Sequence, residues 1–342
     1  MVELIANVNN AINGFVWGVP MLVLLVGTGI LMTILTKFFQ LSHIGHWFKN
    51  TVGGIFHDQH VTKHTDADDQ SISQFQSLCT ALAATIGTGN IVGVASALVA
   101  GGPGAIFWMW IVAFFGMMTN YSENVLGIYY RRKNFKGEWS GGAMYYLKDG
   151  LGSYKGCKQI GAVLAVLFSA FCLLASFGIG NMSQVNSIAA NMTSAFSIPA
   201  TVTGIVLVII GALVIVGGLK RIAAVTEKLV PFMAIAYVIG ALIIFFANIS
   251  HVGAVFTAIF KGAFGLRAVG GGIVGSGVKL ALTWGMKRGV FSNEAGLGTA
   301  PMAHAAATSA SPLVQASIGM LDTFIDTIIV CTMTGFAILV TG

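Results

Sequence analysis

Residues 72–100 read ISQFQSLCTALAATIGTGNIVGVASALVA, an apolar segment with glycines near its middle. An apolar run of about 20 residues is long enough to cross a lipid bilayer as a helix. Gly87-Thr88-Gly89-Asn90 interrupts this run near its middle. Non-helical backbone at membrane depth is tolerated only where it is buried in protein or lines a water-filled cavity. The sequence therefore predicts a broken spanning helix that lines a binding site at residues 87–90. The alternative is a close helix crossing at the glycines.

The chemistry of such a break suits two different ligands. The half-helix that begins at the break has free backbone N–H groups, which bind a carboxylate. The half-helix that ends there has free C=O groups, which bind Na⁺. Thr85, Thr88 and Asn90 add side-chain oxygens. A zwitterion and a metal cation can therefore share the break, and we expect Thr85 and Gly87 to take part in cation binding.

The composition places the rest of the chain in a membrane as well. Of the 342 residues, 56% are hydrophobic and only 9% are charged, whereas soluble domains carry about 25% charged residues. The net charge is +6, but the basic residues lie in a few short loops, a pattern that argues against a nucleic-acid partner. The chain has no P-loop, HExxH or GxSxG motif and no cysteine pair with metal-ligand spacing. We therefore expect neither an enzyme nor a resident cofactor or metal.

Eight apolar runs are long enough to span the membrane, and Lys and Arg are concentrated in every second loop between them. This alternation predicts an all-α polytopic membrane protein whose N-terminus lies outside. We expect it in a prokaryotic plasma (inner) membrane, as a monomer. The runs are residues 15–36, 72–100, 104–130, 160–180, 199–218, 229–248, 274–303 and 314–340.

A second break is predicted in the seventh run, within residues 288–301, RGVFSNEAGLGTAP. It places Glu294 inside an apolar span, where an ionisable group is costly unless it is paired or hydrated. Glu294 is therefore a candidate for cation coupling, or else half of a structural ion pair with Lys287 or Arg288. Two further acids, Asp322 and Asp326, share one helix face that must look inward. They either line a cation path or hydrogen-bond to neighbouring helices. Glu123, near the end of the third run, is expected to have a structural role.

The two stretches that contain the breaks resemble each other. Residues 87–124 and residues 293–327 each have a Gly-rich break, a helix of small residues, a turn with proline, and a helix with a Gly-Met pair and an acid. The breaks lie in spans of opposite direction, as an inverted-topology repeat predicts. The expected organisation is an extra N-terminal transmembrane helix at 1–36, a cytoplasmic loop at 37–71, a first five-helix repeat at 72–250, and the start of a second repeat, truncated within it, at 251–342.

Three motifs carry a resemblance to a known family. GGPGAIFWMW at residues 101–110 resembles the signature of the alanine or glycine:cation symporter family, also called sodium:alanine symporters. ALAATIGTGNIVGVA at residues 81–95 and KRGVFSNEAGLGTAPMAHAAA at residues 287–307 resemble motifs of that family in the expected order. The resemblance implies a LeuT-like fold of two inverted repeats. It also implies import of alanine, glycine or a similar small neutral amino acid by alternating access, coupled to Na⁺ or, less often, to H⁺.

The resemblance also implies substrate binding by seven residues, which are Thr88, Gly89, Asn90, Gln184, Phe291, Ser292 and Asn293. Cation coupling is expected, from the chemistry of the two breaks, at Thr85, Gly87 and Glu294. A channel, an inactive fragment and a nutrient-binding protein are the alternative functions.

Overall fold

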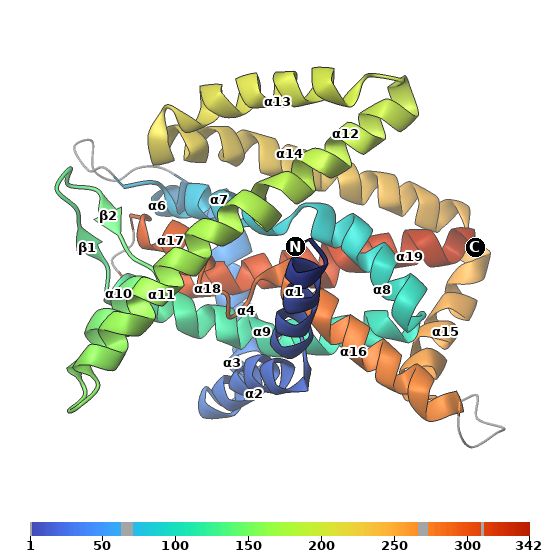
Figure 1. Cartoon of the computed structure of the whole chain (residues 1–342), viewed down its shortest axis with the longest axis horizontal. Helices are drawn as coiled ribbons and strands as arrows, with labels where there is room; N and C mark the ends of the chain where they lie inside the picture. The colour runs from blue at the N-terminus through green and yellow to red at the C-terminus, as the bar shows by residue number, and fades with distance from the viewer. Residues whose placement is uncertain (1, 63–70, 266–272, 309–310) are drawn as a thin grey trace.

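The computed structural model describes residues 2–62, 71–265, 273–308 and 311–342, nearly all of them in helices (Figure 1). Among the described residues, five helices are long and apolar enough to cross a membrane, and a sixth candidate is a helix pair bent by 50°. The prediction of a protein built mainly from apolar helices is confirmed, but these candidates are fewer than the eight predicted spans. Residues 63–70 of the predicted loop 37–71 lie outside the described residues.

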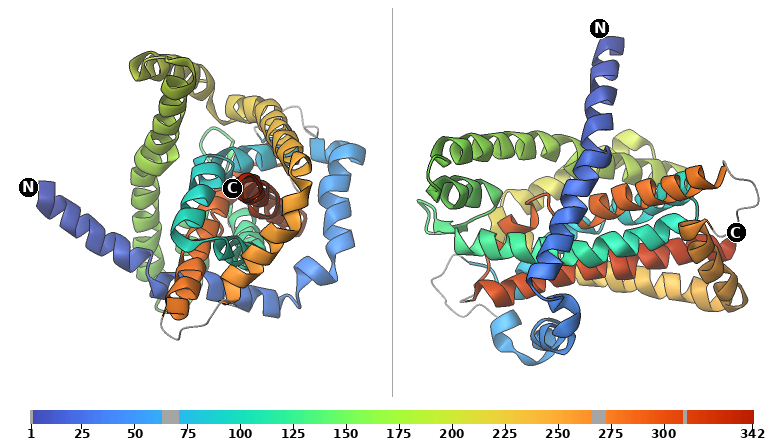
Figure 2. Two further views of the ribbon diagram at one scale, coloured as in Figure 1. Left: turned by 90° about the vertical axis from the view of Figure 1, so that its right-hand side faces the viewer. Right: turned by 90° about the horizontal axis from the view of Figure 1, so that it is seen from below.

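The N-terminal part consists of two long helices followed by a series of short ones. The first helix projects away from the helical bundle in both panels of Figure 2, and most of its large apolar side chains are exposed. The elements are α1 (Val2–Val16), α2 (Val19–Leu35), α3 (Phe39–Ser42), α4 (Ile44–Phe48), η1 (Lys49–Gly53), α5 (Gly54–His57) and α6 (Gln59–Thr62).

The described part of the predicted loop 37–71 is thus folded into short helices. Its apolar side chains anchor it: Trp47 is 1% exposed and packs in a buried cluster with Leu78 and Ile318. The indole Nε1 of Trp47 donates a hydrogen bond to the Gln40 carbonyl at 3.1 Å. From the sequence a loop was expected here, and neither these short helices nor the burial of Trp47 was predicted.

The central part begins with the broken helix. Ser73 and Gln76 start it with a reciprocal capping box, because each side chain accepts the other residue's backbone N–H at 3.0 Å. The elements are α7 (Gln74–Thr85), η2 (Gly89–Gly93), α8 (Val94–Gly101), α9 (Gly104–Tyr129), β1 (Arg132–Lys133), β2 (Trp139–Ser140), α10 (Ala143–Tyr145), η3 (Tyr146–Gly150), η4 (Leu151–Ser153), α11 (Lys158–Phe177), η5 (Gly178–Met182), α12 (Ser183–Phe196), α13 (Ala200–Ile215), α14 (Gly218–Ala247) and η6 (Ile249–His251).

The C-terminal part contains the second break, between two helices of unequal length. Its elements are α15 (Val252–Phe264), α16 (Ile273–Asn293), α17 (Ala300–Ala305), α18 (Pro312–Thr323), η7 (Phe324–Cys331) and α19 (Thr332–Thr341). The strands β1 and β2 form an antiparallel pair in which Arg132 faces Ser140.

Several predicted spans have different lengths in the structure, among them the fourth and the fifth. The fourth was expected to end at Gly180, but the chain continues through the π-helical turn η5 into α12, and Lys158–Phe196 is one run of 39 residues. Gly178 and Gly180 therefore do not end the helix. The fifth span corresponds to α13, which has 16 residues and a length of about 24 Å, short of the bilayer core of about 30 Å.

The core surrounds α9, which packs against α16, α18, α2, α15 and α17. Small residues allow these helices to approach closely. A Cβ atom on Gly29 of α2 would lie 2.6 Å from the Phe115 carbonyl oxygen of α9, and one on Gly104 would overlap the backbone of Gly262. The glycine content therefore serves helix packing as well as the two breaks.

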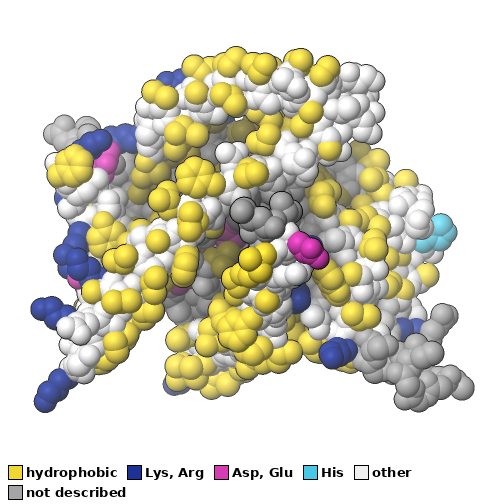
Figure 3. Space-filling view, in the orientation of Figure 1, with side chains coloured by type: hydrophobic (Ala, Val, Ile, Leu, Met, Phe, Trp, Pro, Cys, Tyr) yellow, Lys and Arg dark blue, Asp and Glu magenta, His cyan; other side chains and the backbone are white. Residues whose placement is uncertain are grey.

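The surface also fits a membrane protein. Hydrophobic side chains are spread over the whole face in Figure 3. Lys and Arg side chains gather at its left margin, where Figure 1 places β1, β2 and the start of α11. Arg132 in β1 forms a salt bridge of 2.5 Å with Asp149 at this end.

Candidate functional site

The first break lies between α7 and η2, and the buried side chain of Asn90 holds it. Asn90 is 1% exposed, and its Oδ1 accepts the Gly87 N–H at 2.8 Å. Its Nδ2 donates to Ser292 Oγ at 3.1 Å and to Asp326 Oδ1 at 2.5 Å. Asn90 therefore stabilises the unwound backbone and joins it to the end of α16 and to η7.

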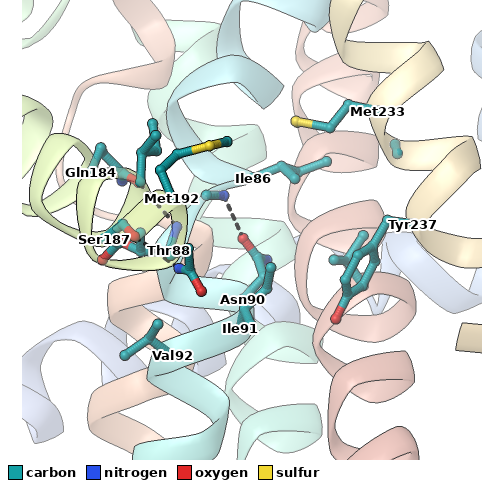
Figure 4. Close-up of a pocket in the computed structure, with 15 residues that line it drawn as sticks. Ile86, Thr88, Asn90, Ile91, Val92, Gln184, Ser187, Met192, Met233 and Tyr237 are labelled. Atoms are coloured by element: carbon teal, nitrogen blue, oxygen red, sulfur yellow. Dashed lines mark hydrogen bonds between the residues drawn. The ribbon is translucent and has the colours of Figure 1, made fainter. Parts of the chain in front are cut away.

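An apolar pocket of about 440 Å³ lies beside this break (Figure 4). Pockets for small molecules measure about 300–1,000 Å³ and combine apolar walls with a few polar groups. The walls come from the first break, α12, α14 and η7. The lining residues are Ile86, Gly87, Thr88, Asn90, Ile91, Val92, Gln184, Ser187, Ile188, Asn191, Met192, Met233, Ala234, Tyr237 and Val330.

Gln184 of α12 lies directly over the break. The Thr88 backbone N–H donates to Gln184 Oε1 at 3.1 Å, and Figure 4 shows the two residues next to each other on one side of the pocket. A Cβ atom on Gly87 would lie 3.0 Å from Gln184 Nε2. Glycine at position 87 therefore leaves room for the Gln184 amide. Of the predicted site residues, Gly87, Thr88, Asn90 and Gln184 line one pocket.

The other four predicted substrate residues lie behind or away from this pocket. Ser292 is 2% exposed and contacts Asn90. Asn293 is buried and donates to Thr327 Oγ1 at 3.3 Å. Phe291 lies beside Trp17, with ring centroids 6.3 Å apart, and a Cβ on Gly89 would lie 3.5 Å from its ring. These residues connect the two breaks to each other, but among the described residues they do not line the pocket.

The second break follows α16 and is held by a carboxylate. Glu294, Gly296 and Gly298 all have positive φ angles, of 53°, 92° and 75°. Glu123 of α9 is 7% exposed, and its two oxygens accept the N–H groups of Gly296 at 3.3 Å and Gly298 at 3.2 Å. Backbone N–H groups are good partners for a buried carboxylate. Glu123 therefore stabilises the irregular segment, in agreement with the structural role expected for it.

Thr85 and Glu294, predicted for cation coupling, line a second cavity of about 300 Å³ together with Asp322. Glu294 Oε2 accepts the Thr299 hydroxyl at 2.6 Å. The alternative of an ion pair with Lys287 or Arg288 is not found among the described residues. Arg288 instead lies over the Phe291 ring, 5.6 Å from its centroid. Lys287 and Arg288 line a different cavity from Glu294.

Several lining residues were not predicted. Ser187 and Asn191 lie on the same face of α12 as Gln184, because they follow it by three and seven residues. Polar residues occur all along α12, so the spacing of these three is the signal that the sequence contains. Met233 and Tyr237 of α14 carry no such signal, since a lipid-facing helix contains the same residue types.

Comparison with known proteins agrees with this architecture. The sodium:alanine symporter family matches residues 2–342. The sodium/alanine symporter AgcS of Methanococcus maripaludis is 48% identical over 97% of this chain and 70% of its own length. A putative sodium/proton-dependent alanine carrier protein, YrbD, of Bacillus subtilis is 40% identical over 97% of this chain and 64% of its own length. The probable sodium/glutamine symporter GlnT of Bacillus subtilis is 36% identical over 99% of this chain and 66% of its own length.

Proposed function

Because the chain belongs to the sodium:alanine symporter family, we propose that it imports a small neutral amino acid, alanine or glycine, together with Na⁺. It is a multi-pass membrane transporter. The proposed mechanism is alternating access, in which the site opens first to one side of the membrane and then to the other.

The observation that carries this proposal is the pocket at the first break. The helix that resumes after Thr88 presents the positive end of its dipole to the pocket, which favours a substrate carboxylate. The Gln184 amide, held by the Thr88 N–H at 3.1 Å, offers both an acceptor for a substrate ammonium and a donor for its carboxylate. Ile86, Met192 and Val330 are apolar walls. They favour a neutral side chain over a charged one.

The two breaks support the same mechanism. The bond from Asn90 Nδ2 to Ser292 Oγ, 3.1 Å long, joins the first break to the end of α16. A LeuT-like pair of inverted repeats predicts such a meeting of the two broken helices at the site. The Lys- and Arg-rich end that contains β1 and β2 is assigned to the cytoplasm of a prokaryotic cell, which places the N-terminus outside. The protein is proposed to work as a monomer.

Uptake of labelled alanine into proteoliposomes tests the proposal. We expect uptake to rise with an inward Na⁺ gradient and to be competed by glycine but not by leucine. Gln184→Ala removes a polar partner worth about 1–3 kcal/mol, so the apparent affinity for alanine should fall about 5- to 150-fold. Asn186→Ala, on the same helix and outside the pocket lining, is the matched control. Absence of uptake from correctly inserted full-length protein would favour a nutrient-binding protein.

Proton coupling is a second candidate. Glu294 and Asp322 line one cavity, and a carboxylate can carry a proton as well as bind Na⁺. A relative at 40% identity is described as sodium/proton-dependent. Uptake driven by a pH gradient, with no response to Na⁺, would select this candidate.

A further inference from the structure

The second cavity lies next to the amino-acid pocket but shares no lining residue with it. Thr85, the last residue of α7, lines the second cavity, and the next residue, Ile86, lines the amino-acid pocket. The two spaces therefore meet at the first break. A ligand in either one contacts the same short piece of backbone.

Asp322 is the unusual group in this cavity. It is 0% exposed, and its Oδ1 accepts the Thr85 hydroxyl at 2.9 Å. Its Oδ2 is buried and has no hydrogen-bond partner among the described residues. An ionised carboxylate oxygen left in this state is strongly unfavourable unless a cation joins it or the group takes up a proton.

Asp326, one helical turn further along, is a buried carboxylate whose two oxygens both accept hydrogen bonds. It is also 0% exposed, but its Oδ1 accepts the Asn90 amide at 2.5 Å and its Oδ2 accepts the Thr327 hydroxyl at 2.7 Å. Asp326 therefore has structural partners for both oxygens. Asp322 has one for Oδ1 only.

The other groups of the cavity are oxygen donors. Glu294 contributes a second carboxylate, and Thr80, Thr85 and Thr299 contribute hydroxyls. Hard cations prefer carboxylate, hydroxyl and carbonyl oxygens. No Lys, Arg or His is found among the described residues that line the cavity, so no side chain there neutralises the two acids.

We propose that Asp322 binds the transported Na⁺ in this cavity, together with Thr85 and Glu294, at a site separate from the amino-acid pocket. This inference rests on the proposed function for the identity of the cation as a transported ion. Na⁺ at Asp322 attracts the Thr85 oxygen and so fixes the end of α7. The adjoining backbone of the first break is then held in the form that binds the amino acid, which couples the two ligands.

The test uses full-length protein purified in detergent and follows its unfolding temperature as NaCl replaces choline chloride at constant ionic strength. For the wild type we expect Na⁺ to raise the unfolding temperature, because a ligand that binds only the folded state stabilises it. In Asp322→Asn the half-saturating Na⁺ concentration should rise about tenfold or more, since a neutral amide replaces the carboxylate that binds Na⁺. Asp149→Asn, which removes a carboxylate in η3, should retain the wild-type response.

A second measurement distinguishes a role of Asp322 in Na⁺ binding from a structural role. In Na⁺-free buffer Asp322→Asn should be at least as stable as the wild type, because it removes an unpaired buried charge. If Asp322 had a structural role, Asp322→Asn would instead be less stable than the wild type in this buffer. Thr85→Val, which preserves shape and removes the hydroxyl, should also weaken the Na⁺ response, and it supplies the test where Asp322→Asn fails to fold.

The outcomes distinguish this inference from the proposed function. A wild type that couples alanine uptake to Na⁺, with a normal Na⁺ response in both folded variants, overturns the assignment of Asp322 and leaves the proposed function intact. A wild type that shows no response to Na⁺ overturns both. Loss of the Na⁺ response in the Asp322 variant alone, with the Asp149 variant unchanged, supports the site.

Discussion

The two breaks are held open by different chemistry. At the first break a neutral amide, Asn90, satisfies the backbone N–H of Gly87 at 2.8 Å. At the second break a carboxylate, Glu123, accepts two backbone N–H groups at 3.3 and 3.2 Å. The first break adjoins an apolar pocket of about 440 Å³. Glu294 of the second break lines a cavity in which it and Asp322 are the two acids. A neutral frame suits a zwitterion, whereas an acidic frame suits a cation.

The strongest test of this difference is Asn90→Ala. The change leaves the Gly87 N–H and a buried Asp326 oxygen without their partner. Each lost partner costs about 1–3 kcal/mol, and more for the charged oxygen, so we expect alanine uptake to fall about 100-fold or more. Uptake per inserted molecule is the measurement. Asn248→Ala, at the exposed end of α14, is the asparagine control, and unchanged uptake in Asn90→Ala would contradict the role of the first break.

Glu123→Gln tests the second break. A Gln side chain has one oxygen where the carboxylate has two, so one of the N–H groups of Gly296 and Gly298 loses its acceptor. We expect the protein to lose about 1.5–3 kcal/mol of stability, measured as a lower unfolding temperature in detergent. Glu138→Gln, in the short loop after β1, should be nearly neutral. Equal stability of the two variants would show that the carboxylate does not hold the break.

Gly87→Ala tests whether the amino-acid pocket can be altered without the cation cavity. The new Cβ would lie 3.0 Å from Gln184 Nε2 and 3.1 Å from its Oε1, so the amide must shift. We expect the KM for alanine to rise about 5- to 30-fold, equivalent to about 1–2 kcal/mol, with little change in the half-saturating Na⁺ concentration. Gly178→Ala, with nothing within 4 Å of its Cβ, is the matched control. A parallel rise in both parameters would mean that the two spaces act as one site.

The smallest expected effect concerns the backbone at Glu294, whose φ of 53° is unusual for a residue other than glycine. Glu294→Gly and Glu294→Ala both remove the carboxylate, but only glycine adopts this conformation without strain. We expect the glycine variant to be more stable than the alanine variant by about 1 kcal/mol, measured by thermal unfolding of the two side by side. Equal unfolding temperatures would indicate that the segment relaxes once the carboxylate is gone.

Much of the architecture could be predicted because its signals are local. The apolar runs around α9 and α18 are read directly from composition. Both breaks are marked by glycines next to polar residues, and the helix ends at Thr85 and Asn293 agree with them. The end of the fourth span was predicted wrongly, since glycines at 178 and 180 stop a helix in many sequences but here lie within the π-helical turn η5.

The candidate site could be predicted only in part. Thr88, Asn90 and Gln184 were identified and line one pocket. The division of the predicted residues between two cavities could not be foreseen, because Thr85 and Ile86 are neighbours in sequence and face different spaces. Phe291 was grouped with the substrate residues by its place in a motif, but it packs beside Trp17.

Membrane insertion, the positions of the two breaks and the polar groups at those breaks could all be inferred from the amino-acid sequence. These properties depend on hydrophobicity and backbone freedom, which act within one turn or one span. The contacts of Glu123 with the second break and of Asp322 with Thr85 were revealed by the folded structure, because they join residues separated by 173 and 237 positions. Such pairs depend on which helix faces pack together, and helix packing is set by the fit of many side chains rather than by any local pattern.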